Sequence, residues 1–341
     1  MQGLAPNLGC QFLFEEKDIK ACFFKTSMLF SRKARKLVWE ENRNWINSKP
    51  LGGEELKGRV VLLDFWTYSC INCRRTRPAL KEIWRKYHNT KFIIIGVHTP
   101  EFEFEKDLTK VQQAVRKLGI EYPVLNDPER INWENYGNTY WPRAAVLNAD
   151  GEIILEHVGE SGYAEIEEEI ISELSKMKQI ASARKIKEEK RFYHPDMSPE
   201  TYAGSARSPG LGSVRVCTKS GCDEYYDSGK YHPNIIYLQG DWQQTAEYLE
   251  FRGESGHLAF RYFAKEVNVV MDGKGSVSIL LDDKPISAAD AGKDVQVKYD
   301  KGLAFLEGAD MYNLVKTKEY REGVLKIIPS KGLRVYAFTF G

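Results

Sequence analysis

The sequence predicts two structured domains of different class, an α/β domain followed by an all-β domain. Strand-like and helix-like stretches alternate over residues 37–175, whereas helical periodicity is lost after residue 200. The first domain is therefore expected to be a mixed sheet with helices on both faces. The second, over residues 201–341, is expected to be a β-sandwich or jelly roll. A chain of 341 residues is long enough to build both cores.

The composition is that of a globular protein, with 42% hydrophobic residues, 28% charged residues and a formal net charge of +1. This balance gives no reason to expect nucleic acid or a membrane surface as a partner. No apolar run reaches the roughly 18 residues of a membrane-spanning helix, so no transmembrane segment is expected.

Residues 1–36 are predicted to be an N-terminal extension, either a short hairpin or a helix. Its most apolar part, residues 21–30, contains Lys25 and precedes the basic cluster, the reverse of the order in a secretory signal. We therefore expect a cytoplasmic protein. The alternative is an extracytoplasmic location, if the N-terminus is mis-assigned or trimmed.

The α/β domain is expected to begin with two buried parallel strands separated by a helix. Each strand is a continuous apolar run, which is typical of a strand buried on both faces. An amphipathic helix that stops at Gly119, a hairpin and a terminal helix complete the domain. In chain order the expected elements are strand 59–66, helix 70–87, strand 91–98, helix 103–119, hairpin 143–159 and helix 163–177.

Residues 176–200 are first highly charged and then contain proline, which indicates a helical tail and a linker. The all-β domain is predicted from short, mostly alternating runs that Gly and Pro interrupt. These runs are residues 257–273, 275–285, 294–302, 324–332 and 333–341.

The six cysteines form three local pairs, of which Cys70 and Cys73 are closest in sequence. A zinc site would need two further ligands at suitable spacing, and the only other close pair lies in the other predicted domain. A structural bridge would close a very small loop and stabilise little. We therefore favour a redox-active dithiol. For Cys217 and Cys222, which enclose a turn-prone segment, a structural disulfide is favoured over free thiols. The pairing of the remaining two, Cys10 and Cys22, is left open.

The dithiol falls where a buried strand ends and a helix begins. The free N–H groups and the positive dipole end of a helix favour thiolate over thiol. We expect Cys70 to attack a partner's disulfide, and Cys73, one turn inside, to resolve the mixed disulfide. Arg74, Arg75 and Arg77 add positive charge, but a solvated helix face is favoured over a catalytic role.

Asp64 precedes Cys70 by six residues, within an otherwise apolar strand. Burial of a carboxylate raises its pKa. We expect Asp64 to exchange a proton with Cys73 through a water molecule. The alternative is a paired or solvated carboxylate at the strand end.

The segment DFWTYSCINC resembles the active-site segment of thioredoxin-fold proteins, and within them the TlpA-like group. The resemblance assigns Asp64, Trp66, Cys70, Cys73 and the helix-kinking Pro78 to that motif. GVHTPEFEFEKD and YWPRAAVLNADGEIILEHVGESGYAE resemble the C-terminal region of DipZ-type cytochrome c biogenesis proteins.

In that family, the proline of the YWP stretch is a cis-proline beside the dithiol, which implies this role for Pro142. The backbone of Trp141 would then pair with an incoming peptide as an extra strand. SPETYAGSAR and YAFTFG also resemble DipZ-type proteins, whose C-terminal portion is a jelly roll similar to carbohydrate-binding modules. The sequence has no stretch resembling the multi-span membrane part with which those proteins begin, so the electron donor is left open.

Other side chains are candidates near the dithiol. Trp66 and Tyr68 are expected to shield the site or contact a substrate, with core packing as the rival for Trp66. Glu101 and Glu103 follow a strand end, where sites of parallel sheets open, and a solvated loop is the alternative for both. His98 is favoured as a structural histidine. In the β domain, four aromatic residues could form a sugar-stacking platform, although core packing is the default: Trp242, Tyr225, Tyr226 and Tyr231.

We therefore expect a thiol–disulfide oxidoreductase that exchanges electrons with cysteines of client proteins and uses no metal or organic cofactor. The β domain would aid client recognition or restrict access. The alternative is a binding module for a glycan or a protein, with the dithiol domain as a redox sensor or passenger. The expected site residues are Cys70 as nucleophile, Cys73 as resolving thiol, Asp64 as proton relay, Pro142 in the substrate groove, and Trp66, Tyr68, Trp141 and Glu101 in substrate binding.

Overall fold

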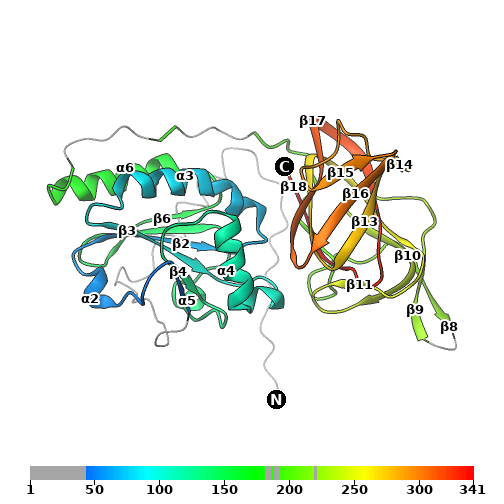
Figure 1. Cartoon of the computed structure of the whole chain (residues 1–341), viewed down its shortest axis with the longest axis horizontal. Helices are drawn as coiled ribbons and strands as arrows, with labels where there is room; N and C mark the ends of the chain where they lie inside the picture. The colour runs from blue at the N-terminus through cyan, green and yellow to red at the C-terminus, as the bar shows by residue number, and fades with distance from the viewer. Residues whose placement is uncertain (1–43, 181–185, 188–191, 219–220) are drawn as a thin grey trace, which may run out of the picture.

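The computed structural model describes residues 44–180, 186–187, 192–218 and 221–341. Figure 1 shows two domains side by side, an α/β domain coloured blue to green and a β domain coloured mainly yellow to red. The predicted extension over residues 1–36, including Cys10 and Cys22, lies outside the described residues.

The α/β domain is built on one six-stranded sheet with strand order β1-β4-β3-β2-β5-β6. The three strands β2, β3 and β4 are parallel, whereas β1, β5 and β6 run antiparallel to their neighbours. Every residue of β2 and β3 is buried, as their continuous apolar runs predict. The strands are β1 (Trp45–Ile46), β2 (Val60–Trp66), β3 (Phe92–His98), β4 (Val124–Asn126), β5 (Arg143–Leu147) and β6 (Ile153–Val158).

Helices cover both faces of this sheet, which confirms the predicted architecture. Alternate residues of β2 pack with α3, α4 and α6 on one face and with α2 and α5 on the other. The stretch expected as one helix over 103–119 divides into η1 and α4, because the carboxylate of Asp107 caps α4 by accepting the Thr109 N–H at 2.8 Å. The helices are α2 (Gly53–Leu56), α3 (Ile71–Tyr87), η1 (Glu103–Lys106), α4 (Leu108–Lys117), α5 (Ile131–Asn135) and α6 (Tyr163–Lys176).

The second domain is all-β: among the described residues from 198 onwards there are strands and turns but no helix. Two long strands, β12 and β17, pair along most of their length. The first half of β12 also pairs with β10 and its second half with β18, so the sheet bends around one apolar core. The strands are β7 (Thr201–Tyr202), β8 (Val214–Thr218), β9 (Gly221–Tyr226), β10 (Ile236–Gln244), β11 (Leu249–Phe251), β12 (His257–Asp272), β13 (Lys274–Leu281), β14 (Lys284–Pro285), β15 (Val295–Lys298), β16 (Lys301–Glu307), β17 (Asp310–Ile328) and β18 (Arg334–Phe340).

The core of the β domain takes up aromatic residues that were candidates for a sugar-stacking platform. Trp242 and Tyr225 are buried in it, so their default assignment to core packing is confirmed. Tyr231 is half-buried and donates its hydroxyl hydrogen to Asp227 at 2.8 Å, whereas Tyr226 is exposed on β9. An all-β domain is thus confirmed, whereas its likeness to a jelly roll or carbohydrate-binding module stays a prediction.

Cys217 on β8 is disulfide-bonded. The side chain of Cys222 lies outside the described part of the chain, so the pairing of these two cysteines stays a prediction.

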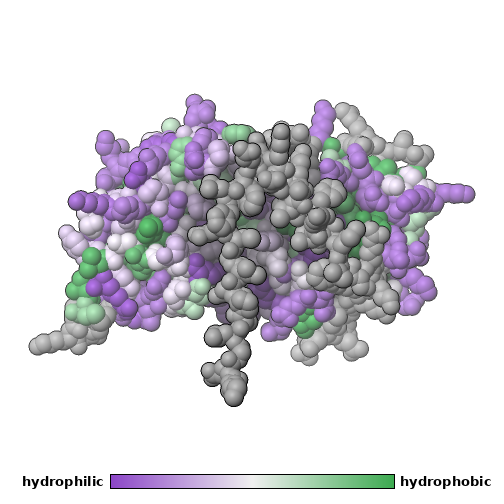
Figure 2. Space-filling model, turned by 180° about the vertical axis from the view of Figure 1, so that it is seen from behind, coloured by the Kyte–Doolittle hydropathy of each residue, from purple (hydrophilic) through white to green (hydrophobic). Residues whose placement is uncertain are grey.

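Figure 2 shows hydrophilic side chains over most of the described surface that is seen from this side, on both domains. Within the described residues, no helix combines the length and the apolar character needed to cross a bilayer.

Candidate active site

The dithiol lies at the N-terminus of α3, directly after the loop that leaves β2. Cys70 is the N-cap residue, with extended backbone (φ −76°, ψ 119°), and its Sγ accepts the Cys73 N–H at 3.2 Å. Both cysteines are free thiols; Cys70 is partly exposed, whereas Cys73 is 2% exposed. Burial raises the pKa of Cys73 well above its usual value, and the hydrogen bond with Cys70 adds to this. The geometry thus presents one accessible thiol with a second, protonated thiol directly behind it.

Asp64 lies beneath the dithiol on β2 and is 2% exposed. Burial raises its pKa to about 7, although the Arg77 guanidinium and a hydrogen bond from Tyr122 oppose the rise. Among the described residues, none forms a hydrogen bond with its Oδ1. A carboxyl group with a pKa near neutrality can both take up and release a proton at physiological pH.

The three arginines that follow Cys73 are not a solvated helix face, so that expectation was wrong. Arg77 is 7% exposed, with its guanidinium carbon 5.9 Å from the centre of the Trp66 ring. The side chains of Arg74 and Arg75 are only 12% and 8% exposed. Arg74 pairs with Asp310 of the β domain, and Arg75 pairs with Glu160 of the α/β domain and Glu266 of the β domain. Sequence periodicity along α3 could not reveal a cover that comes from the other domain.

The aromatic residues before the dithiol pack around a buried histidine. Trp66 meets the His98 ring edge-on at 5.0 Å between ring centres, and Tyr68 stacks on it at 5.6 Å. Burial lowers the pKa of His98 to about 4, so its ring is neutral at pH 7 and hydrogen-bonds with Asn126 at 3.2 Å. His98 therefore has the structural role that was favoured. Trp66 is 2% exposed, so its side chain packs in the core and offers no surface to a client.

Pro142 lies at the same edge of the sheet as the dithiol loop. The Trp141–Pro142 peptide bond is cis, the conformation that the resemblance implies. Arg143, the next residue, pairs with Phe65 near the end of β2, which places Pro142 beside the strand end that leads to Cys70. Trp141 is half-buried and stacks on Trp133 with 4.1 Å between ring centres.

The acidic residues after β3 face in different directions. The carboxylate of Glu101 accepts hydrogen bonds from Tyr202 and Arg207 of the β domain, both at 2.8 Å, so it joins the two domains. The Glu103 side chain is 71% exposed and pairs with Lys106 at 2.9 Å. Glu105 is fully buried and accepts the N–H of Ser69, the residue before Cys70, at 3.2 Å. Glu105 could not be distinguished in the sequence, because its neighbours Glu101 and Glu103 have the same side chain and only the tertiary structure separates the three.

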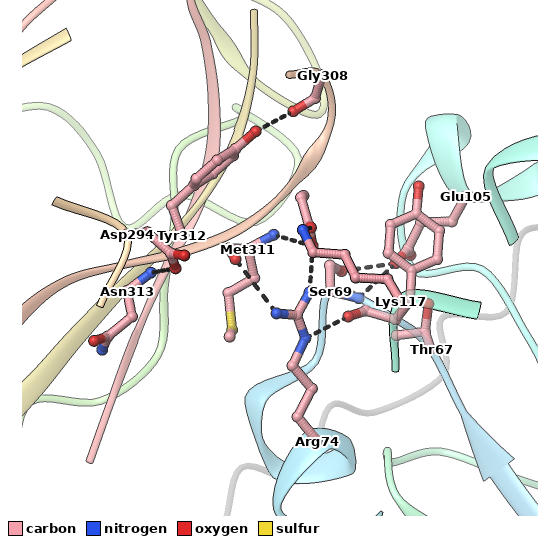
Figure 3. Close-up of polar contacts among 12 residues, drawn as sticks. Thr67, Ser69, Arg74, Glu105, Lys117, Asp294, Gly308, Met311, Tyr312 and Asn313 are labelled. Carbon is pink, nitrogen blue, oxygen red and sulfur yellow. Dashed lines mark hydrogen bonds and ion pairs between the residues drawn. The ribbon is translucent and has the colours of Figure 1, made fainter. Parts of the chain in front are cut away.

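The β domain packs against the dithiol edge through polar contacts. Arg74 donates to the Asp310 carboxylate, to the Met311 carbonyl at 3.4 Å and to the Tyr68 carbonyl at 2.8 Å. Lys117 on α4 binds the other oxygen of Asp310 at 2.7 Å. Figure 3 shows Arg74 and Lys117 reaching from the α/β domain towards the β-domain strand that carries Met311.

Apolar side chains complete the domain contact. Phe102 and Phe104 meet the Tyr336 ring at 5.2 and 4.8 Å between ring centres. Ile71, which directly follows Cys70, packs against the same cluster. Beside it runs an interdomain groove of about 560 Å³, lined by Tyr68, Lys110, Gln113, Ala114, Lys117, Lys293, Asp294, Gln296, Phe305, Glu307, Gly308, Ala309, Asp310 and Tyr312.

Among the described residues, no three His, Cys, Asp or Glu side chains gather closely enough to hold a metal ion.

Family models match both domains. Residues 58–153 match the family described as thioredoxin-like, and residues 198–341 match the family described as a thioredoxin-like C-terminal domain. These matches confirm the thioredoxin-like fold that the dithiol segment predicts.

Individual proteins are similar to one or both domains of this chain. Over 308 residues, 87% of this chain, the sequence is 30% identical to Protein DipZ of Mycobacterium tuberculosis, of which it spans 41%. It is 24% identical over 126 residues, 37% of this chain, to the thiol-disulfide oxidoreductase YkuV of Bacillus subtilis, covering 84% of that protein. A solved thiol-disulfide isomerase from Corynebacterium glutamicum is 20% identical, with a TM-score of 0.37 over 41% of this chain and 97% of its own. The chain thus spans about two fifths of the DipZ relative, and its two domains match thioredoxin-like family models, the first over the stretch that holds the Cys-x-x-Cys dithiol and the second over the β domain.

Proposed function

We propose that this protein is a thiol–disulfide oxidoreductase that exchanges electrons with the cysteines of client proteins. The observation that carries the proposal is the pair itself: an accessible Cys70 at a helix N-terminus with a buried Cys73 whose N–H reaches its sulfur. A helix N-terminus stabilises negative charge on a thiolate. The curated name of YkuV, which matches the α/β domain, points to the same reaction class.

In the reducing direction, the Cys70 thiolate attacks one sulfur of a client disulfide and expels the other as a thiolate. Cys73 then gives up its proton and attacks the Cys70 sulfur, which releases the second client thiolate and leaves a Cys70–Cys73 disulfide. Two electrons pass from the dithiol to the client, and the reverse sequence oxidises a client. No metal or organic cofactor enters these steps.

Asp64 is the proposed acceptor of the Cys73 proton, through a water molecule. Burial raises the pKa of the Cys73 thiol, so the second step needs a base. With its own pKa at about 7, Asp64 is matched to that task near neutral pH.

The backbone of Trp141 and Pro142 is the proposed docking edge for the client segment. Position supports this role, because β5 starts beside the end of β2, where the dithiol loop begins. An extended client segment could add to this edge through main-chain hydrogen bonds.

The β domain is proposed to select clients by covering part of the dithiol edge. Residues next to the cysteines, Ile71 and Arg74, contact it directly. A glycan-binding role is not favoured, because Trp242 and Tyr225 are buried in the core and cannot stack on a sugar.

The test compares the wild type with Cys70→Ser and Cys73→Ser in the reduction of a protein disulfide. Cys70→Ser should abolish turnover, and Cys73→Ser should accumulate a mixed disulfide through Cys70 that mass spectrometry detects. Undiminished turnover by Cys70→Ser would overturn the proposal. Equilibration in thiol buffers gives the reduction potential of the Cys70–Cys73 pair and hence the direction of electron flow. A potential of about −270 mV indicates a reductant, and a potential of about −120 mV indicates an oxidant.

A further inference from the structure

Glu105 on η1 is a fully buried carboxylate that lies between the dithiol loop and the segment that contacts the β domain. Its Oε1 accepts the Ser69 N–H at 3.2 Å and the Ser69 hydroxyl at 2.7 Å. Its Oε2 accepts the backbone N–H groups of Glu101 at 2.7 Å and Phe102 at 3.1 Å. Figure 3 shows Ser69 and Glu105 close together on the α/β-domain side of the contact.

All four of these groups are donors, so each carboxylate oxygen is needed as an acceptor. An amide in the same place would offer one oxygen and one NH2 group, and the NH2 group would face donors on one of the two sides. Burial raises the pKa of Glu105, while hydrogen bonds from the side chains of Thr67 and Ser69 and from the backbone of Glu101 and Phe102 counteract the rise. These hydrogen bonds explain why a buried carboxylate is kept in this position.

The two segments that Glu105 joins have different tasks. Ser69 directly precedes Cys70, so its backbone sets where the nucleophilic sulfur lies. The segment 101–104 holds the β domain: Glu101 binds Tyr202, and the Glu103 N–H donates to Glu247 at 3.2 Å. Phe102 and Phe104 add the ring contacts with Tyr336.

We infer that Glu105 is a positioning residue that holds Ser69, and through it Cys70, against the segment to which the β domain is attached. The inference rests on the proposed thiol–disulfide exchange at Cys70. The position of the β domain and the reactivity of Cys70 are then linked through one carboxylate.

The test uses the full chain with Glu105→Gln, and Glu103→Gln as the matched control. Glu103 lies on the same 3-10 turn and undergoes the same chemical change, but its side chain is exposed and does not reach Ser69. Two rates are measured for Cys70: its alkylation by iodoacetamide as a function of pH, and its single-turnover reaction with oxidised glutathione. Mass spectrometry identifies the modified cysteine in each case. Misplacement of a reacting atom by about 1 Å can cost on the order of 100-fold in rate.

We expect Glu105→Gln to slow the glutathione reaction about 10- to 100-fold and to move the alkylation pH profile, while Glu103→Gln matches the wild type. A merely structural role would lower the unfolding midpoint and leave the pH profile of the folded protein unchanged, and this result would overturn the inference. If Glu105→Gln does not fold, Ser69→Ala decides, because it removes only the hydroxyl bond: an unchanged Cys70 profile would refute the positioning role. A wild type that does not react with disulfides would refute the proposed function alone, since the alkylation profile still reports on Glu105.

Discussion

Replacing Asp64 with Asn should make the protein more stable at alkaline pH than at acid pH, relative to the wild type. The wild-type carboxyl has a pKa of about 7 in the folded protein against an ordinary value of 3.8. Between these two values the folded state holds a proton that the unfolded state has released, so the free energy of unfolding falls as pH rises. This difference in pKa corresponds to about 4 kcal/mol in the free energy of unfolding. Because Asp64 is fully buried, solvent does not screen the effect.

The assay is urea-induced unfolding of the wild type and Asp64→Asn at pH 4 and pH 8. The stability difference between the two proteins should change by about 4 kcal/mol in favour of the variant from pH 4 to pH 8. Any cost that does not depend on pH, such as a change in packing around the amide, cancels in this comparison. Asp150→Asn, in the exposed β5–β6 turn, is the matched control and should follow the wild-type pH dependence.

The same variant tests the proton relay. Without the carboxyl, the rate of the resolving step should fall about 100-fold or more. The rate should also no longer change with pH near pH 7, where Asp64 titrates in the wild type. A stability difference that is the same at both pH values would refute the assignment of a raised pKa to Asp64, and with it the reason for giving this residue the relay role.

His98→Gln should have the opposite pH dependence. Burial lowers the pKa of His98 from 6.5 to about 4, so the wild type loses up to about 3 kcal/mol of stability as pH falls from 6.5 to 4, and the variant should not. Urea unfolding at pH 7 and pH 4 measures this, and equal losses in both proteins would contradict it. Asp310→Asn should weaken the domain contact, because it removes the ion pairs with Arg74 and Lys117. A loss of about 2 kcal/mol corresponds to a roughly 30-fold rise in the undocked fraction and in the reaction of Cys70 with a bulky maleimide. Glu254→Gln, which removes an exposed ion pair within the β domain, is the control. Equal rates of maleimide reaction in both variants would refute the claim that the docked β domain limits access to Cys70.

Local signals in the sequence were sufficient for the longer elements of the α/β domain, whereas the short elements β1, α2, β4 and α5 were not predicted. Continuous apolar runs identified β2 and β3, and the cysteine spacing after a strand end identified the dithiol at the start of α3. The predicted helix 103–119 divides into η1 and α4 because Asp107 caps α4, and a side chain that accepts a hydrogen bond from a free N–H group of the first turn favours a helix start at that point.

The sequence by itself determined the class of both domains, the Cys70–Cys73 pair at a helix start and the buried Asp64 on the preceding strand, because each depends on residues close in the chain or on one strand. Only the tertiary structure decided which polar groups are exposed. Arg74 is covered by a segment that includes Asp310, 236 residues further along the chain, and Glu105 differs from Glu101 only in what surrounds it. Burial and electrostatic partners depend on distance in space, and no pattern along one strand or helix encodes the surface that a second domain brings to it.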